Sequence, residues 1–426
     1  MQIETYKKYV SVIAVLLLIG CLVLAIKRDT RNLADGYACD LRKRIVGSRY
    51  QALGYSPYFF KWQPGYPETL ANPYEVGPGL AQNSTTLAPP YLWLLQPLAQ
   101  LSFPTIEKVW LLLQYLFLFI IAYLFYRLAT DWPQRVLVVL VTGATLFSVG
   151  WIGNADIGQS YLLFPMIWTA GYAMGRHTAK PWLWAAITLA VSCWLRPVCG
   201  LLALPFLFMP QRQYFLKVFT LAGLVLIAQV LLTGQWHNWI DFFKSSVLWG
   251  KYYASWGAHA YSEVGNTAMP TVIEGQSDFS ITPLPDYMAN LPMVVQALFG
   301  KPLLGTMAYT VLLAIGIVFL TRRSWKQMSN LSLEKRWQGG FLLYYSLEFF
   351  AVIPKPSYYF LELLFPIYLL VTCWQQLKWT SRFLLLTGLL IGLLPSGIIP
   401  MHLLLGEYMI VAAIIVYWFA KENRPD

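Results

Sequence analysis

The chain has 426 residues, of which 57% are hydrophobic and only 12% are charged, about half the charged fraction of a typical soluble domain. This composition excludes an ordinary soluble enzyme and predicts an all-α polytopic bundle of transmembrane helices. The net charge of +11 does not indicate a nucleic-acid partner, because the lysines and arginines form short clusters between apolar runs and no continuous basic face. The 18 Trp and 27 Tyr are typical of a protein with much surface at the membrane interface.

About twelve apolar stretches predict membrane spans, because a bilayer core about 30 Å thick needs roughly 20 apolar residues, or fewer where helices break. These stretches are residues 9–26, 105–126, 136–152, 160–175, 181–195, 198–209, 214–233, 302–320, 338–353, 359–374, 381–397 and 401–419. The first follows a basic N-terminus and lacks a small-residue cleavage site, so we interpret it as a retained signal anchor. Residues 87–103 are also apolar, but a span there would invert every later loop, so we expect a re-entrant or interfacial helix.

Clusters of lysine and arginine in alternating short loops predict the topology, because such clusters stay in the cytoplasm. They place both termini in the cytoplasm and make residues 1–426 a single multi-pass domain of a plasma membrane or cell inner membrane. The non-cytoplasmic face then receives two large loops, 27–104 and 234–302, and two short turns, 153–159 and 354–358. Polar residues that could carry chemistry gather on that face.

The first large loop contains the densest polar cluster, which begins at Asp40 and continues through a basic segment. The spacing of Leu41, Ile45 and Val46 predicts a short amphipathic helix lying on the membrane surface. A carboxylate at the start of that helix can act as a general base toward a hydroxyl, while the basic side chains offer charge to a phosphate leaving group. The alternative is an N-cap aspartate with Arg44 as its i+4 partner on a solvated helix.

Three further polar features interrupt apolar runs. Gln159 stands at the head of a helix after the turn at 153–159, although the glycines and Asp156 there also fit a simple turn. Arg196 precedes a helix-breaking proline, and as an unpaired charge its guanidinium needs an anion, a carbonyl or water. Lys355 lies in a predicted outside turn against the positive-inside rule, where it can bind an anion or reach lipid headgroups.

Other polar residues indicate neither a metal nor a cofactor. Glu348, Glu362 and Glu407 lie within apolar stretches, where they can pair structurally. The four histidines are scattered without a ligand spacing, and no Gly-rich nucleotide loop is present, so we predict no metal and no ATP. The five cysteines show no CxxC pair and no disulfide framework.

Several short motifs occur after the signal anchor and before the rest of the bundle. They are Asp40-Leu-Arg-Lys-Arg-Ile-Val-Gly47 with Tyr55-Ser-Pro-Tyr58, Thr86-Leu-Ala-Pro-Pro90 with Pro97, Gly158-Gln159, and Leu195-Arg196-Pro197. This arrangement, over roughly residues 30–215, resembles the GT-C superfamily of polyprenol-phosphate-sugar-dependent glycosyltransferases and its bacterial alpha-mannosyltransferase-like branch. The chain departs from the family pattern in having Ser160-Tyr161 where an asparagine is usual, and arginine where the broken helix usually carries lysine.

The resemblance implies an inverting transfer of a hexose or pentose, mannose favoured, from a polyprenyl-phosphate-linked donor to a lipid or glycan acceptor, without a metal. Asp40 would deprotonate the acceptor hydroxyl, and basic residues would stabilise the departing phosphate. The expected substrate-binding residues are Arg42, Gln159, Arg196, Asn266, Lys355 and Tyr359. The expected partners are the donor, the acceptor and membrane lipids.

Two other classes of protein stay open at this point. A transporter or flippase of a lipid-linked saccharide would also need many spans and buried charges. Such proteins often carry broken helices in matching halves, whereas here only the first half is clearly broken, at Arg196. The third class is an inactive scaffold or assembly subunit.

Overall fold

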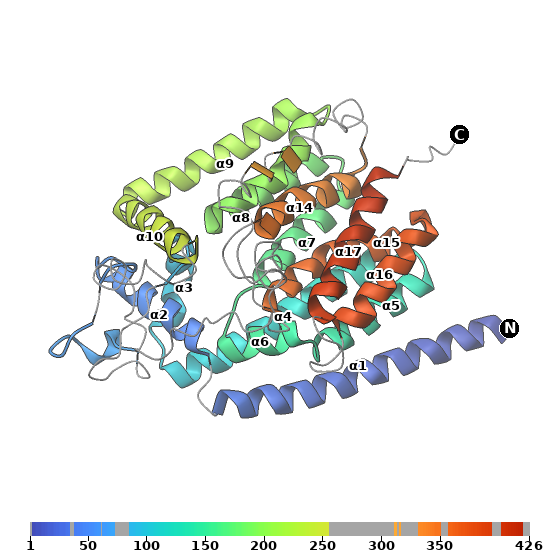
Figure 1. The fold of residues 1–426 in the computed structure, drawn as a ribbon, viewed down its shortest axis with the longest axis horizontal. Coiled ribbons are helices and arrows are strands. Elements are labelled where there is room, and N and C mark those ends of the chain that lie inside the picture. The colour runs from blue at the N-terminus through green and yellow to red at the C-terminus, as the bar shows by residue number, and fades with distance from the viewer. Residues whose placement is uncertain are drawn as a thin grey trace.

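The protein is described from a computed structural model, which covers residues 2–34, 38–60, 62–72, 85–254, 311–312, 315–316, 331–350, 357–393 and 402–420. Within these ranges all regular structure is helical and no β-strand forms, so the prediction of an all-α fold is confirmed. Figure 1 shows most helices gathered in one bundle, with the long N-terminal helix lying along its side.

The described first half of the chain contains two long helices, α1 and α4, and several shorter ones. Its helices are α1 (Gln2–Ala34), α2 (Cys39–Ala52), η1 (Glu68–Leu70), α3 (Pro89–Ala99), α4 (Phe103–Leu128), α5 (Trp132–Thr145), α6 (Val149–Ile157), α7 (Leu163–Arg176) and α8 (Pro181–Leu195). Proline stands in the first turn of α3, α4, α5 and α8, where its missing N–H would have no helical partner anyway. Asp131 and Ser148 cap α5 and α6 by accepting backbone N–H bonds of 2.9 and 3.1 Å.

The second half begins where α8 breaks at Arg196, whose backbone is extended, as the following proline predicts. Its helices are η2 (Pro197–Phe208), α9 (Arg212–Leu232), α10 (Trp236–Ala254), α14 (Leu333–Phe350), η4 (Ser357–Leu363), α15 (Leu364–Thr372), η5 (Trp374–Gln376), α16 (Trp379–Gly392) and α17 (His402–Phe419). The segments labelled η are 3-10 helices, and in η2 Pro197 and Pro205 interrupt α-helical bonding.

Four described helices, α1, α4, α9 and α17, are long and apolar enough to cross a membrane. The pair α5 and α6, bent by 54° where Ser148 starts a new helix, would make five if it counts as one span. These helices support a membrane protein. With only 11 residues, or about 16 Å, α3 is too short to span a bilayer, as expected for the segment 87–103.

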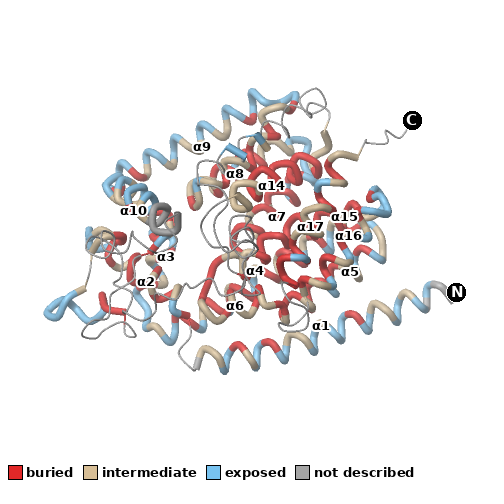
Figure 2. Tube along the Cα trace, in the orientation of Figure 1, coloured by how far each residue is buried: buried red, intermediate tan, exposed pale blue. Residues whose placement is uncertain are grey.

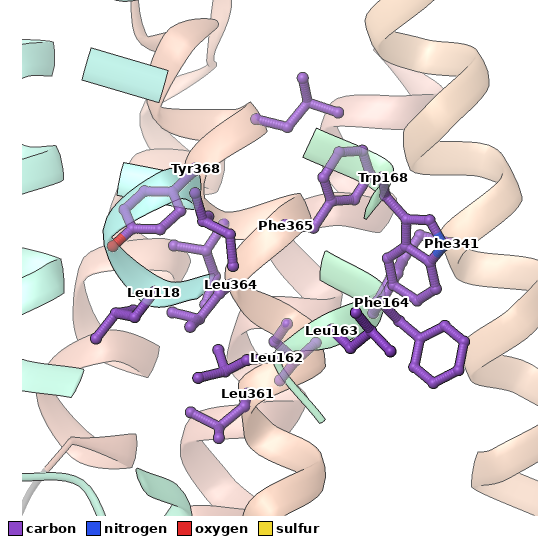
Figure 3. Packing of buried hydrophobic residues seen from close by; sticks show 14 of the residues in the cluster. Leu118, Leu162, Leu163, Phe164, Trp168, Phe341, Leu361, Leu364, Phe365 and Tyr368 are labelled. Atoms are coloured by element: carbon purple, nitrogen blue, oxygen red, sulfur yellow. The ribbon is translucent and has the colours of Figure 1, made fainter. Parts of the chain in front are cut away.

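The core is centred on α15, whose residues from Leu364 to Val371 are all buried. This helix packs against α4, α5, α7, α14 and α17. Figure 3 shows the ring of Phe365 near Trp168, and burial of one such large side chain contributes about 1.5–3 kcal/mol. By contrast, α1 and α9 expose apolar side chains along much of their length (Figure 2), as helices facing lipid do.

Candidate functional site

The Asp40 carboxylate lies at the start of α2, on the second residue of the helix. The N-cap is Ala38, so the alternative interpretation of Asp40 as the N-cap is wrong. The helix is also not a solvated one, because Leu41, Ile45 and Val46 are buried and α2 packs against α3 and α6. The Asp40 side chain nevertheless remains 30% exposed.

Gln159 holds this carboxylate, although 119 residues separate the two along the chain. Its Nε2 donates to Asp40 Oδ2, while its Oε1 accepts from the guanidinium of Arg44. An arginine can only donate, so Arg44 fixes which way the Gln159 amide points and keeps the NH₂ group on Asp40. Lys43 lies on the other side, with its Nζ 3.5 Å from Asp40 Oδ1. The carboxylate is thereby oriented and has acceptor capacity left for a hydroxyl.

Gly158 allows α6 to approach α2 closely enough for this contact. It ends α6 in the left-handed conformation, with φ of 71°, and a Cβ at this position would lie 2.5 Å from the Cβ of Leu41. Arg44 donates to its carbonyl oxygen at 3.0 Å, and Ala38 N donates to the carbonyl of Asp156 at 2.5 Å. The prediction of a turn over 153–159 is wrong for residues 153–157, which form the last part of α6, and the backbone carbonyls of Asp156 and Gly158 dock the start of α2.

Replacing Gly158 with alanine should separate α2 from the turn. We expect Gly158→Ala to lower the free energy of unfolding by about 1–3 kcal/mol more than Gly234→Ala does, because of overpacking against Leu41. Gly234 is a matched control, with a similar φ of 68° and no atom within 4 Å of an added Cβ. Thermal unfolding of both variants in detergent measures the difference. Equal losses would mean that the close approach at Gly158 contributes nothing.

Arg42, the next predicted site residue on α2, pairs with a carboxylate of another helix. It is 3% exposed and its guanidinium donates to Glu107 of α4 at 2.8 Å. The glutamate neutralises the charge that was expected to meet a phosphate, so Arg42 ties α2 to α4. Its proposed contact with substrate is not supported by this position.

Arg196 lies in a second polar cluster. Its guanidinium donates to Glu362 of η4 and, at 2.8 Å, to Glu348 of α14. The expectation of an unpaired charge is therefore wrong, while the structural pairing expected of Glu348 and Glu362 is confirmed. Four aromatic rings surround the guanidinium carbon at 5.6 to 5.8 Å, namely those of Tyr161, Phe164, Tyr344 and Tyr359.

The two clusters are joined by three consecutive residues. Gln159 belongs to the first cluster, and Tyr161 packs against Tyr359 in the second with ring centroids 4.4 Å apart. The structure thus brings Gln159, Arg196 and Tyr359 into one region, together with Asp40. Sequence reasoning missed Tyr161, although its place two residues after Gln159 was a usable signal. Asn266 and Lys355 lie outside the described residues.

Cys39 is the residue that precedes Asp40 in the chain. The thiol of Cys39 is not an activated nucleophile, because desolvation and the neighbouring Asp40 carboxylate raise its pKa. Among the residues that the structure describes, no group of three or more His, Cys, Asp or Glu side chains is placed to hold a metal ion.

No protein-family model, curated protein or solved structure matches the chain.

Proposed function

We propose that the chain is a GT-C-like glycosyltransferase of a plasma membrane or inner membrane. It transfers a hexose or pentose, mannose favoured, from a polyprenyl-phosphate-linked donor to a lipid or glycan acceptor on the non-cytoplasmic face. The observation that best supports this proposal is the Asp40 carboxylate, partly exposed, oriented by Gln159 and adjacent to Lys43. A fixed carboxylate with free acceptor capacity is the group that general-base transfer to a hydroxyl needs.

In the proposed reaction Asp40 takes the proton of the acceptor hydroxyl. The hydroxyl oxygen attacks the anomeric carbon, the bond from that carbon to the phosphate oxygen breaks, and polyprenyl phosphate leaves with the electron pair. Lys43 Nζ, 3.5 Å from Asp40 Oδ1, places a positive charge beside the reacting groups. Gln159, which is 3% exposed and bonded to Arg44 and Asp40, would orient the sugar or the acceptor indirectly, by holding the Asp40 carboxylate in place.

The proposed phosphate partners are Arg196 and Lys355, with Asn266 and Tyr359 as further substrate contacts. Arg196 is 22% exposed on its side chain and uses two donors on Glu348 and Glu362. A guanidinium has further N–H donors, so the exposed edge can still meet a phosphate oxygen. Charge developing on that oxygen would be stabilised by several kcal/mol in a water-poor site.

An assay of donor consumption tests the function directly. Purified protein in detergent or nanodiscs is incubated with a panel of polyprenyl-phosphate sugars and candidate acceptors, and polyprenyl phosphate is measured. We expect release that depends on the acceptor and disappears in Asp40→Asn. Movement of a lipid-linked saccharide across vesicles without such release would favour the transporter or flippase.

We also propose twelve spans with both termini in the cytoplasm. On this topology, single cysteines placed at the half-buried positions Asp156 and Ile157 of the segment 153–159 should react with a membrane-impermeant reagent from outside, whereas cysteines in 322–336 should be protected. The lysines and arginines of the second segment give the reason, since short basic loops stay inside. Labelling of both segments from the same side would overturn the span count.

A further inference from the structure

Helix α10 follows α9 after a short turn and runs in a different direction (Figure 1). The turn contains Gly234 in the left-handed conformation, with φ of 68°, and its N–H donates to the carbonyl of Leu231 at 3.2 Å. α10 then contacts α3, and the ring of Phe242 lies against that of Tyr58 with centroids 5.8 Å apart. One side of α10 is therefore fixed against the protein.

The large apolar residues of α10 gather on the side that faces away from the protein. Four of them recur at spacings of four, three and four residues, so they share one face of the helix. They are Trp236, Ile240, Phe243 and Val247, with 45%, 43%, 55% and 58% of their surface exposed. We call these four residues the outer stripe.

The face of α10 opposite the outer stripe carries three polar residues. Ser245 there is 4% exposed, and Asn238 and Asp241 are half-buried. A helix on the surface of a soluble protein has the reverse arrangement, with its apolar face toward the core and its polar face toward water. The medium that surrounds the outer stripe is therefore expected to be less polar than water.

The edges of the outer stripe suit the boundary between lipid headgroups and acyl chains. His237 and Lys244 are exposed along one edge, and Ser246 is exposed along the other. A lysine at such an edge can keep its ammonium among the headgroups while its stem lies on apolar surface. Tryptophan, here Trp236, is favoured at the same depth. Amphipathic helices of this kind lie in the plane of the membrane surface with the apolar face buried.

The outer stripe also continues an apolar surface that faces lipid. α9 is long and apolar enough to cross a membrane, and its Leu224, Leu231 and Leu232 are 56%, 62% and 88% exposed. Only residues 233–235 separate Leu232 from Trp236, the first residue of the stripe. A bilayer that surrounds α9 therefore reaches the start of α10.

We propose that α10 is a membrane-interface helix whose outer stripe lies at the boundary of headgroups and acyl chains in a phospholipid bilayer, beside the end of α9. Its partner is the lipid surface, which it contacts through the acyl chains, so phosphatidylcholine alone suffices. Through Phe242 and Tyr58 the helix ties the segment that carries Asp40 to this surface. The inference does not depend on sugar transfer.

Photolabelling of the unmodified protein tests the proposal. The protein is reconstituted in phosphatidylcholine vesicles in which a fraction of the lipid carries a diazirine on its acyl chain, and lipid adducts are mapped by mass spectrometry. We expect adducts on the outer stripe and on the exposed leucines of α9, and none on the buried Ser245. The adducts on α9 are the internal control for reconstitution. Adducts on α9 without any on α10 would overturn the proposal.

Collisions of a spin label with paramagnetic reagents measure the same arrangement residue by residue. The variants Phe243→Cys, Ser246→Cys and Val247→Cys are labelled in a Cys39→Ser background, because Cys39 is the exposed one of the five native cysteines. The background without an added cysteine provides the blank. At Phe243 and Val247 the ratio of collisions with oxygen, which partitions into lipid, to collisions with a water-soluble nickel complex should be several-fold higher than at Ser246. It should approach the ratio at Leu224→Cys on α9.

Two results of the collision experiment contradict the proposal. Equal ratios at Phe243, Val247 and Ser246 would place the outer stripe in water. Few collisions with either reagent at Phe243 and Val247 would mean that a second copy or another part of the chain covers the stripe. Should Phe243→Cys not fold, Val247→Cys and the photolabelling of the unmodified protein still decide. Sugar transfer enters neither measurement, so failure here is distinct from failure of the proposed function.

Discussion

Asp40→Asn should reduce sugar transfer about 10²–10⁴-fold, the contribution of a positioned general base. Asparagine keeps the shape of the side chain, and its carbonyl oxygen can still accept the Gln159 bond that Asp40 accepts. The substituted side chain cannot take a proton from the acceptor hydroxyl at neutral pH. We therefore expect normal membrane insertion and donor binding with transfer nearly abolished, measured as polyprenyl phosphate released at matched protein levels.

Asp35→Asn provides a nearby control. Asp35 precedes Gly36, as a turn residue would, and lies outside the described residues, so it is chosen on sequence alone. It should retain most of the transfer activity. Turnover by Asp40→Asn within a fewfold of wild type, or an inactive Asp35→Asn beside an active Asp40→Asn, would mean that the base is assigned to the wrong residue.

The positions of the helices follow closely from the apolar runs. The bounds predicted as 181–195 coincide with α8, although this helix is shorter than those long enough to cross a membrane, and 105–126 differs from α4 (Phe103–Leu128), which is long enough, by two residues at each end. Hydropathy succeeds here because each run is long, continuous and bounded by proline or charge. The run 136–152 was predicted as one continuous span. It falls on two helices, α5 and α6, which are bent by 54° relative to each other because Ser148 caps a new helix within the run. A serine inside an apolar run was the available signal.

The pairing of charged residues could not be predicted from the sequence in the same way. Arg196 meets Glu348 and Glu362 at separations of 152 and 166 residues, and Arg42 meets Glu107 at 65. Neither helical periodicity nor local motifs carry information over such distances, because these contacts depend on how helices pack. The sequence predicts that the polar residues share one face of the membrane, but it could not tell a free guanidinium from a neutralised one. The second large loop, which holds Asn266, lies mostly outside the described residues.

Arg196→Ala should impair the protein in two ways that can be separated. Removing the guanidinium leaves two nearly buried carboxylates without their cation, a loss that costs about 3–5 kcal/mol for buried pairs, so folding or expression should fall. If Arg196 also stabilises the leaving phosphate, transfer by the protein that does fold should drop about 10²–10³-fold. Arg196→Lys should retain part of both, since charge survives without the planar fork.

The double variant Arg196→Ala with Glu362→Gln distinguishes a structural arginine from one that meets the donor. It removes one carboxylate along with the cation, so only Glu348 loses its guanidinium partner, and the Tyr344 hydroxyl still donates to that carboxylate. Thermal unfolding in detergent should therefore recover toward wild type. Transfer should stay low, with weakened binding of the polyprenyl-phosphate donor, because no guanidinium faces the phosphate. Recovery of transfer together with stability would show instead that Arg196 serves only to hold Glu348 and Glu362 in place.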